Sequence, residues 1–266
     1  MTKDPFHYIY GPVDSWRLGR SLGVDPISAE QKVCNFNCVY CQLGATARQT
    51  GVREVFVPAQ KILDEVCRLD PQIQVDYITF SGRGEPTLAQ NLGEMIGGVR
   101  RCRKERIAVI TNSGLIGRAD VREDLGRADC VLAKLDACDQ GLFEAVDRPQ
   151  TEARFDEIVD GLRLFAREFS GTLALQLMFI EANKACAKAM AKVAASIGAD
   201  EIELNTPLRP CGVAPLSVEE MTRIKVYFQD LPGVTMVYER RHTGAGTQVL
   251  DAEATVKRHG EYRKDI

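Results

Sequence analysis

The stretch Val75-Asp76-Tyr77-Ile78-Thr79-Phe80-Ser81-Gly82-Arg83-Gly84-Glu85-Pro86-Thr87-Leu88 carries a pattern that the rest of the chain repeats. Residues 75–81 are rich in β-branched and aromatic side chains, which predicts a strand. A glycine-containing turn follows. Residues 88–104 then place apolar side chains at three- and four-residue steps, as in an amphipathic helix. Together they form one β/α unit.

The same alternation continues on both sides of this unit. A first strand is expected near 31–33, and further strand patterns lie at 106–111, 130–136, 172–180, 201–205 and 234–238. Helical patterns lie between or beside them at 58–69, 118–127, 151–169, 184–197 and 217–231. Because strands and helices alternate in six or seven units, the sequence predicts an α/β fold with a parallel sheet, closed into an open, partial TIM-type (β/α)6 barrel.

Length and composition fit one such domain. The 266 residues are 45% hydrophobic, which suffices for a single full core. We expect the barrel over 31–238, a short N-terminal extension over 1–30 and a C-terminal tail over 239–266 that is a candidate lid. The formal net charge of −3 argues against an overall basic field for nucleic acid. Without a signal peptide or a long apolar run, we expect a cytoplasmic protein.

Three cysteines follow the expected first strand in the segment Cys34-Asn35-Phe36-Asn37-Cys38-Val39-Tyr40-Cys41. Three thiolates on one short loop can hold three irons of a [4Fe-4S] cube and leave the fourth iron open to an outside ligand. A structural zinc site needs a fourth protein ligand. The chain's only histidines, His7, His242 and His259, are remote in sequence. We therefore favour an iron–sulfur cluster over zinc.

The other six cysteines carry no such spacing. Each stands alone, without a C-x2-C partner, and we interpret them as small buried apolar side chains: Cys67, Cys102, Cys130, Cys138, Cys186 and Cys211. No second cysteine cluster follows residue 138, which argues against an auxiliary iron–sulfur centre.

Polar residues follow the predicted strands. In the turn Ser81-Gly82-Arg83-Gly84-Glu85, two glycines allow close backbone approach, and the carboxylate can accept hydrogen bonds from an ammonium group. Asn112 and Ser113 end the next strand, where they can contact a ligand or simply cap a helix. These two strand ends and the cysteine loop after the first strand face the same rim of a parallel barrel, where ligands bind.

Two further predicted strands, residues 130–136 and 172–180, contain polar side chains. Lys134 and Asp136 share one strand face by alternation. Gln176 lies among leucines and a methionine, so its amide needs a partner, either the backbone or a ligand.

These motifs together resemble the radical S-adenosylmethionine (SAM) superfamily. The C-x3-C-x2-C loop with an aromatic before its last cysteine is similar to the superfamily's cluster loop, and S-G-x-G-E-P-T-L is similar to its Gly-Gly-Glu element. Residues 10–25, residues 32–44, Asn183 and residues 203–210 look like the group of iron–sulfur oxidoreductases related to wyosine-synthase enzymes. Asp14-Ser15-Trp16 departs from that group's usual Pro-Ser-Arg, and the winged-helix-like extension of many relatives has no counterpart here.

The resemblance implies two cofactors, a [4Fe-4S] cluster and SAM, and an external one-electron reductant of the flavodoxin or ferredoxin kind. Reductive cleavage of SAM would give a 5′-deoxyadenosyl radical that abstracts hydrogen. Cys34, Cys38 and Cys41 would ligate the cluster. The residues expected to contact SAM are Tyr40 beside the adenine, Gly82, Gly84 and Glu85 at the methionine end, and Asn112, Ser113, Asp136 and Gln176 at the ribose or carboxylate.

The substrate stays open at this point. Candidate substrate contacts are Arg17, Arg20, Asn183, Arg209 and Arg241. A small molecule or cofactor precursor is favoured. The alternatives are tRNA modification, which the wyosine-synthase resemblance suggests and the acidic pI near 5.8 opposes, and an iron–sulfur redox or assembly protein that does not cleave SAM. An amine-binding Glu85 would distinguish the enzyme from an electron carrier, and no membrane partner is expected.

Overall fold

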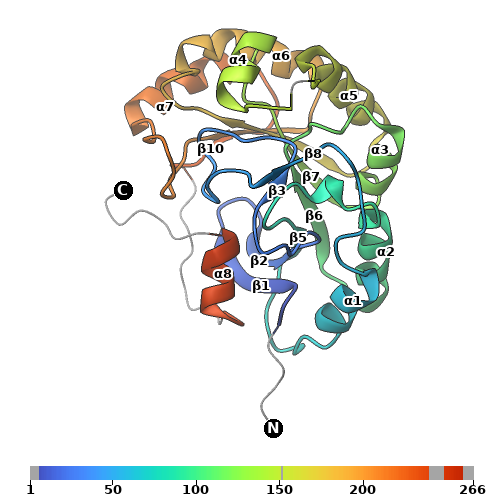
Figure 1. Cartoon of the computed structure of the whole chain (residues 1–266). Helices are drawn as coiled ribbons and strands as arrows, with labels where there is room; N and C mark the ends of the chain where they lie inside the picture. Colours follow the sequence, from blue (N-terminus) through green and yellow to red (C-terminus); the bar gives the residue numbers. More distant parts are fainter. Residues whose placement is uncertain (1–5, 151, 240–248, 260–266) are drawn as a thin grey trace.

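The fold is a curled sheet with helices on its outer side (Figure 1). The structure is a computed structural model that describes residues 6–150, 152–239 and 249–259. The main sheet has eight strands in the order β1-β2-β5-β6-β7-β8-β9-β10. They span β1 Ile9–Ser15, β2 Gly19–Val24, β5 Tyr77–Phe80, β6 Arg106–Thr111, β7 Cys130–Lys134, β8 Thr172–Met178, β9 Glu201–Asn205 and β10 Val234–Met236. A separate two-stranded sheet pairs β3 Val33–Cys34 with β4 Arg48–Gln49.

Every pairing in the main sheet is parallel except the first. β1 runs antiparallel to β2, and β2 then runs parallel to β5. The sheet curls into a half-barrel, and this confirms the predicted open, partial TIM-type barrel. We call the end at the carboxyl ends of the parallel strands the mouth. The opposite end, which the β1–β2 turn closes, is the floor.

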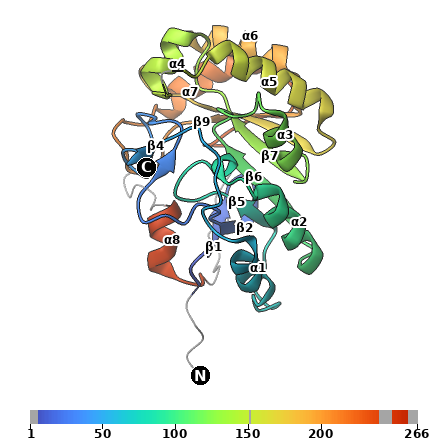
Figure 2. The same cartoon turned by 45° about the vertical axis from the view of Figure 1, so that its right-hand side comes forward.

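The helices are α1 Ala59–Cys67, α2 Leu92–Cys102, α3 Ala119–Leu125, α4 Gln140–Val146, α5 Phe155–Glu168, α6 Ala187–Ile197, α7 Val218–Lys225 and α8 Ala252–His259. Six of them lie within the predicted helical ranges, whereas α4 and α8 were not predicted. Three short 3-10 segments lie at Pro86–Leu88, Lys184–Cys186 and Val226–Phe228. Figure 2, a turned view, shows α1 to α7 on the outer face of the sheet and α8 beside β1.

Strand alternation separates two environments. On β8, Leu173, Leu175 and Leu177 face the helices and join the large apolar core. The alternate positions, such as Ala174, face the barrel interior, where Ala174 packs with Ala108 and Leu132. Because small residues occupy several interior positions, the interior keeps room for a ligand.

The first parallel strand differs from the sequence expectation. Residues 31–33 were expected to begin the barrel, but Val33 instead pairs with Arg48 in the small sheet. β2 takes the barrel position. Its interior-facing residues, Ser21 and Gly23, are small and polar or lack a side chain, so the segment lacks the β-branched signature on which the strand prediction depends.

Two cysteines also differ from expectation. Cys67 at the end of α1 and Cys102 at the end of α2 form a disulfide, with their Cα atoms 5.7 Å apart. Each residue is exposed, so neither is the buried apolar side chain that its helical position suggested. The disulfide joins two helices that become neighbours only when the sheet forms. The sequence spacing of Cys67 and Cys102 therefore did not indicate a disulfide.

No helix in the described part of the chain is long and apolar enough to cross a bilayer.

Candidate active site

The cysteine loop, residues 34–41, lies across the mouth of the barrel. Val33 forms a parallel bridge with Gly84, its N–H donates to the Arg83 carbonyl at 3.2 Å, and its carbonyl accepts from the Glu85 N–H at 3.2 Å. The chain enters the loop directly from this bridge. The loop that follows β5 thus holds the cysteine loop by backbone hydrogen bonds.

The glycine at 84 is required by this close approach. A Cβ placed on Gly84 would lie 1.8 Å from the Val33 carbonyl oxygen, which no side chain can tolerate. Gly82 has φ +145°, and a Cβ there would lie 2.3 Å from Cγ of Asp25. The two predicted glycines therefore let the strand-end loop pack against both the cysteine loop and β2.

All three cysteines of the loop line one cavity of about 280 Å³. The Cys34 sulfur accepts from the Asn112 amide at 3.4 Å and from the Phe36 N–H at 3.5 Å, and the Cys38 thiol donates to Asp147 at 3.5 Å. In the described chain no three cysteine, histidine or carboxylate side chains are grouped around a single ion. In a cube, three sulfurs bind three different irons and need not converge on one point.

Burial favours the protonated form of two of these thiols, Cys34 and Cys38. Burial raises the pKa of the Cys34 thiol to about 12, and Glu85 adds to the shift. Burial, together with Asp147, also raises the pKa of Cys38 well above its ordinary value. Iron binding must therefore displace thiol protons. The donors from Asn112 and Phe36 toward the Cys34 sulfur suit the thiolate that would result.

Glu85 is fully enclosed at the mouth. Its Oε1 accepts from the Thr87 N–H at 3.1 Å, the Thr87 hydroxyl at 2.7 Å and the Thr111 hydroxyl at 2.6 Å. Its Oε2 accepts one hydrogen bond among the described residues, from the Asn112 N–H at 2.8 Å. Burial raises the pKa of this carboxyl, opposed by these donors. A carboxylate oxygen accepts two hydrogen bonds, so Oε2 keeps one lone pair for an ammonium.

Asn112 and Ser113 have different surroundings. Asn112 lines the cavity, and its amide contacts the cysteine loop through Cys34 and, at 2.6 Å, through the Asn35 side-chain oxygen. Ser113 is fully buried, and its hydroxyl donates to the Lys134 carbonyl at 3.0 Å. The structure places Asn112 at the cavity and Ser113 behind it, where Ser113 joins β6 to β7.

A cluster of charged groups surrounds Tyr40. Its hydroxyl donates to Asp136 and, at 3.1 Å, to Asp147. Lys134 lies 4.8 Å from the centre of the Tyr40 ring and 3.1 Å from the Asp136 carboxylate, so the predicted pair on one strand face does form. Burial, with Asp136 nearby, raises the pKa of Asp147 to about 8. These contacts hold the Tyr40 ring rigidly at the cavity wall.

The other candidate residues lie in different environments: at the cavity, on the surface or buried away from the cavity. Gln176 and Arg209 line the cavity, as does Arg17 at the floor. Arg20 lies on the surface, paired with Asp76 at 2.6 Å. Asn183 is fully buried and donates to the backbone carbonyls of Asp136 and Met178. Arg241 falls outside the described residues.

α8 forms one wall of the cavity through Arg258 and His259. The Arg258 guanidinium donates to the fully buried Asp25 carboxylate at 3.0 Å, and His259 lies 2.7 Å from Arg209. Arg209 in turn donates to Gln42 at 2.9 Å, directly after the last cysteine of the loop. Residues 252–259 of the C-terminal tail therefore line the cavity, while residues 240–248 and 260–266 of this candidate lid fall outside the described residues.

Several residues of the site had no sequence signal. Asp147 follows α4, a helix that the sequence analysis did not predict, and Asp25 and Arg258 are 233 residues apart. Thr87 and Thr111 did have a signal, because each lies beside a motif residue. A rule that buried carboxylates need donors would have pointed to these threonines.

Comparison with known proteins agrees with the site. Residues 31–194 match the family model described as the Radical SAM superfamily, and the chain belongs to that superfamily. It is 41% identical over 206 residues to UPF0026 protein slr1464 of Synechocystis sp., covering 77% of each protein. It is 34% identical to UPF0026 protein MJ1312 of Methanocaldococcus jannaschii, covering 84% of this chain and 72% of that one.

A solved structure shares the fold. The structure of TYW1 with a lysine-pyruvate adduct bound matches with a TM-score of 0.61 at 17% identity, covering 80% of this chain and 74% of that one. Because the chain belongs to the radical SAM superfamily, the protein is an enzyme of that type, whose cofactors are a [4Fe-4S] cluster and SAM. Enzymes of this superfamily generally need an external reductant.

Proposed function

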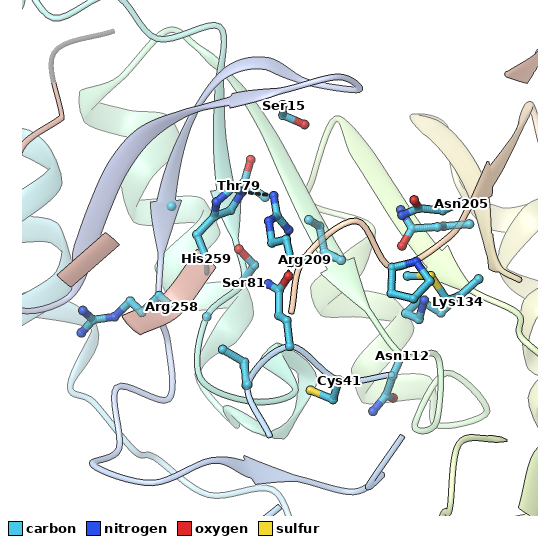
Figure 3. A pocket seen from close by; sticks show the side chains of 18 of the residues that line it. Ser15, Cys41, Thr79, Ser81, Asn112, Lys134, Asn205, Arg209, Arg258 and His259 are labelled. Carbon is cyan, nitrogen blue, oxygen red and sulfur yellow. Dashed lines mark hydrogen bonds between the residues drawn. The ribbon is translucent and has the colours of Figure 1, made fainter. Parts of the chain in front are cut away.

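We propose that this enzyme cleaves SAM reductively at the mouth and uses the resulting 5′-deoxyadenosyl radical to abstract hydrogen from a small molecule held inside the barrel. One observation carries this proposal: a single cavity extends from the cysteine loop into the barrel interior. Its lining includes Cys41 and Glu85 at the mouth and Thr79 and Arg17 deeper inside. Figure 3 shows Cys41 and Asn112 near one end of this cavity and Ser15 near the other.

Different residues at the mouth would bind the cluster and the separate parts of SAM. Cys34, Cys38 and Cys41 would hold the cluster, and the free lone pair on Glu85 Oε2 would receive the ammonium of SAM. Asn112 would fix the position of Cys34. The Tyr40 ring, held by its two carboxylate partners, would form a flat wall beside the adenine.

A cavity inside the barrel also favours a small substrate. A radical formed at the mouth must be kept from water and other acceptors, and burial supplies that exclusion. We further propose that the tail contributes to this closure, because α8 already forms a wall. We also propose a cytoplasmic location, because a reducing compartment preserves thiolate ligands; there the exposed Cys67 and Cys102 would be kept as thiols.

The proposal is tested by anaerobic reconstitution with iron and sulfide, reduction, addition of SAM, and chromatography for 5′-deoxyadenosine. The wild-type chain should bind about four irons and form 5′-deoxyadenosine. Cys38→Ala should lose both properties. Cys211→Ser is the matched control, because the Cys211 thiol donates to the Val213 carbonyl and serine keeps that donor.

The alternatives give different results. Stoichiometric zinc in the wild type, or an iron content that Cys38→Ala leaves unchanged, would refute the cluster assignment. A full cluster that never yields 5′-deoxyadenosine would favour an iron–sulfur redox or assembly protein.

A further inference from the structure

The disulfide between Cys67 and Cys102 has no part in the proposed function. Neither cysteine is among the described residues that line the cavity, and both are exposed to solvent. The other seven cysteines are free thiols. An exposed disulfide is within reach of small thiols and is reduced more readily than a buried structural one. Exposure therefore indicates a bond that can open and close in the folded protein.

The packing of two helices brings these cysteines together. Cys67 ends α1 and Cys102 ends α2, and the two helices lie side by side, as Figure 1 and Figure 2 both show. One helical turn earlier, Leu63 and Gly98 lie on the same faces as the cysteines. A Cβ on Gly98 would lie only 2.5 Å from Cδ1 of Leu63, so the helices approach closely because position 98 has no side chain. This packing does not depend on the disulfide, so the two thiols would stay close after reduction.

Further contacts hold the ends of α1 and α2 in place. Arg103, which follows α2 directly, donates to the Leu69 carbonyl beyond the end of α1 at 3.5 Å. Glu65 on α1 is buried, and its carboxylate accepts from the His7 N–H at 2.7 Å. These contacts involve neither sulfur. A pair of thiols held in this way can close into a disulfide without rearrangement of the fold.

The disulfide closes a loop around the segment that carries the glycine turn of the mouth. Its two cysteines are 35 residues apart, and the residues between them include β5 and Gly82–Glu85. A cross-link restricts the unfolded chain and so stabilises the folded state. The bond itself lies at the floor end of the barrel, because the chain passes from the ends of α1 and α2 to the floor ends of β5 and β6. It can therefore stabilise this segment without contact with the mouth.

Cluster binding is expected to contribute to the stability of the mouth. Ligands that bind only the folded chain stabilise it, and a bound cluster does so in the same way. A chain that has lost its cluster under oxidising conditions loses that contribution. The same conditions convert exposed thiol pairs into disulfides. A disulfide between Cys67 and Cys102 would then support the segment that carries Glu85 until a cluster is inserted again.

We propose that Cys67 and Cys102 are a reversible oxidation site, and that its disulfide form stabilises the segment from β5 to α2 when the cluster is absent. The oxidant is a small-molecule disulfide such as oxidised glutathione. One protein thiolate attacks a sulfur of that molecule and releases one small thiol, and the second protein thiolate then displaces the other. Two protein thiols are thereby oxidised to one disulfide, the small disulfide is reduced to two thiols, and the two protons pass to the released thiols. The reverse exchange opens the bond.

Equilibration of the cluster-free full chain with mixtures of reduced and oxidised glutathione tests the site itself. After acid quenching, unfolding and alkylation, peptide mass spectrometry reports the state of each cysteine. As the oxidised proportion rises, Cys67 and Cys102 should pass together from alkylated thiols to a linked peptide pair, and dithiothreitol should reverse this in the folded chain. Cys130, buried in the barrel interior, is the internal reference and should stay a thiol. Separate glutathione adducts without a linked pair, or a bond that dithiothreitol leaves intact, would overturn the inference.

Thermal unfolding of the cluster-free chain tests the stabilisation. The oxidised wild type should melt at least about 5 °C above the reduced wild type. Cys67→Ser and Cys102→Ser should both melt near the reduced wild type in every glutathione mixture, because neither can close the bond. Cys211→Ser is the matched control and should keep the full difference. Equal melting temperatures of the oxidised and reduced wild type would contradict the stabilising role.

Hydrogen exchange locates the effect. In the oxidised wild type, the amides of residues 68–101 should exchange more slowly than in the reduced form, and Cys67→Ser should show no such difference. If slower exchange occurred only outside this range, the disulfide would not stabilise the segment that carries Glu85. These measurements involve neither SAM nor 5′-deoxyadenosine, so this inference and the proposed function fail independently.

Discussion

The mouth and the floor of this barrel are specified by different kinds of sequence. At the mouth, functional groups come from short contiguous segments, residues 34–41 and 82–85, whose spacing is itself the signal. Toward the floor, Gln176 and Glu203 are far apart in the chain and meet because β8 and β9 pair in register, and the β1–β2 turn brings Arg17 to Glu203. A motif can reveal the first kind of site, whereas the second becomes visible only in the folded sheet.

The largest effect on the mouth is expected from separating the cysteine loop from the loop that follows β5. Gly84→Ala places a Cβ against the Val33 carbonyl and must push the strand-end loop from the cysteine loop. We expect SAM binding to be lost and the free energy of unfolding to fall by about 1–3 kcal/mol, the cost of overpacking. Calorimetry with SAM and urea unfolding measure the two effects.

Gly97→Ala is its control. Gly97 lies in the middle of α2, and the nearest atom to a new Cβ would be Nη1 of Arg101, 3.8 Å away. Helix propensity predicts a gain of up to about 1 kcal/mol in stability there. Normal SAM affinity in Gly84→Ala would show that the two loops need not touch.

A smaller change tests the chemistry of the mouth alone. Glu85→Gln should keep the cluster but weaken SAM binding by roughly 1.5–3 kcal/mol, because the amide no longer offers a charged acceptor to the ammonium. Glu94→Gln on the exposed face of α2 is the control. Equal SAM affinity in wild type and Glu85→Gln would remove Glu85 from the binding site.

The side wall of the cavity that α8 forms, between the mouth and the floor, can be tested through Arg258. Arg258→Gln leaves the buried Asp25 carboxylate without its guanidinium, although the Ile27, Ser28 and Arg83 N–H groups still donate to it. We expect a loss of about 2 kcal/mol in the free energy of unfolding at neutral pH, below the usual cost of an unpaired buried charge because those donors remain.

The pH dependence of this variant has a defined sign. Burial already raises the pKa of Asp25 above its ordinary value of 3.8, and Arg258 opposes the shift. Removing Arg258 raises the folded-state pKa further. Since the unfolded state is the same in both proteins, the variant loses stability relative to wild type as pH rises from the folded-state pKa of Asp25 in the wild type through the higher one in the variant, and recovers it in acid. Urea unfolding at several pH values measures this; a loss that is the same at every pH would contradict it.

The smallest expected effect lies near the floor. Thr79→Val keeps the shape of the side chain but leaves the Ser21 hydroxyl without its partner, and should lower the free energy of unfolding by about 1 kcal/mol. No change in urea unfolding would mean that water replaces the lost partner, and the floor would then be wetter than its burial suggests.

The sequence predicted most of the fold and about half of the site, for identifiable reasons. β6 and β9 have the predicted bounds because apolar residues fill most of β6 and alternate with polar residues along β9. β2 was missed because its interior face carries Ser21 and Gly23. The cysteine loop and the glycine turn were identified because their function depends on local spacing. Asp25, Asp147 and Arg258 were missed because each acts through a partner distant in the chain.

The central claim is that the cluster has one iron open to SAM at the mouth. Paramagnetic resonance of the reduced, reconstituted protein tests it most directly, because a ligand on one iron changes the spectrum of the whole cluster. We predict that SAM shifts the wild-type spectrum in a saturable way and that Glu85→Gln needs a higher SAM concentration for the same shift. A wild-type spectrum that SAM leaves unchanged would contradict the account, because the cluster would then have no iron open to SAM.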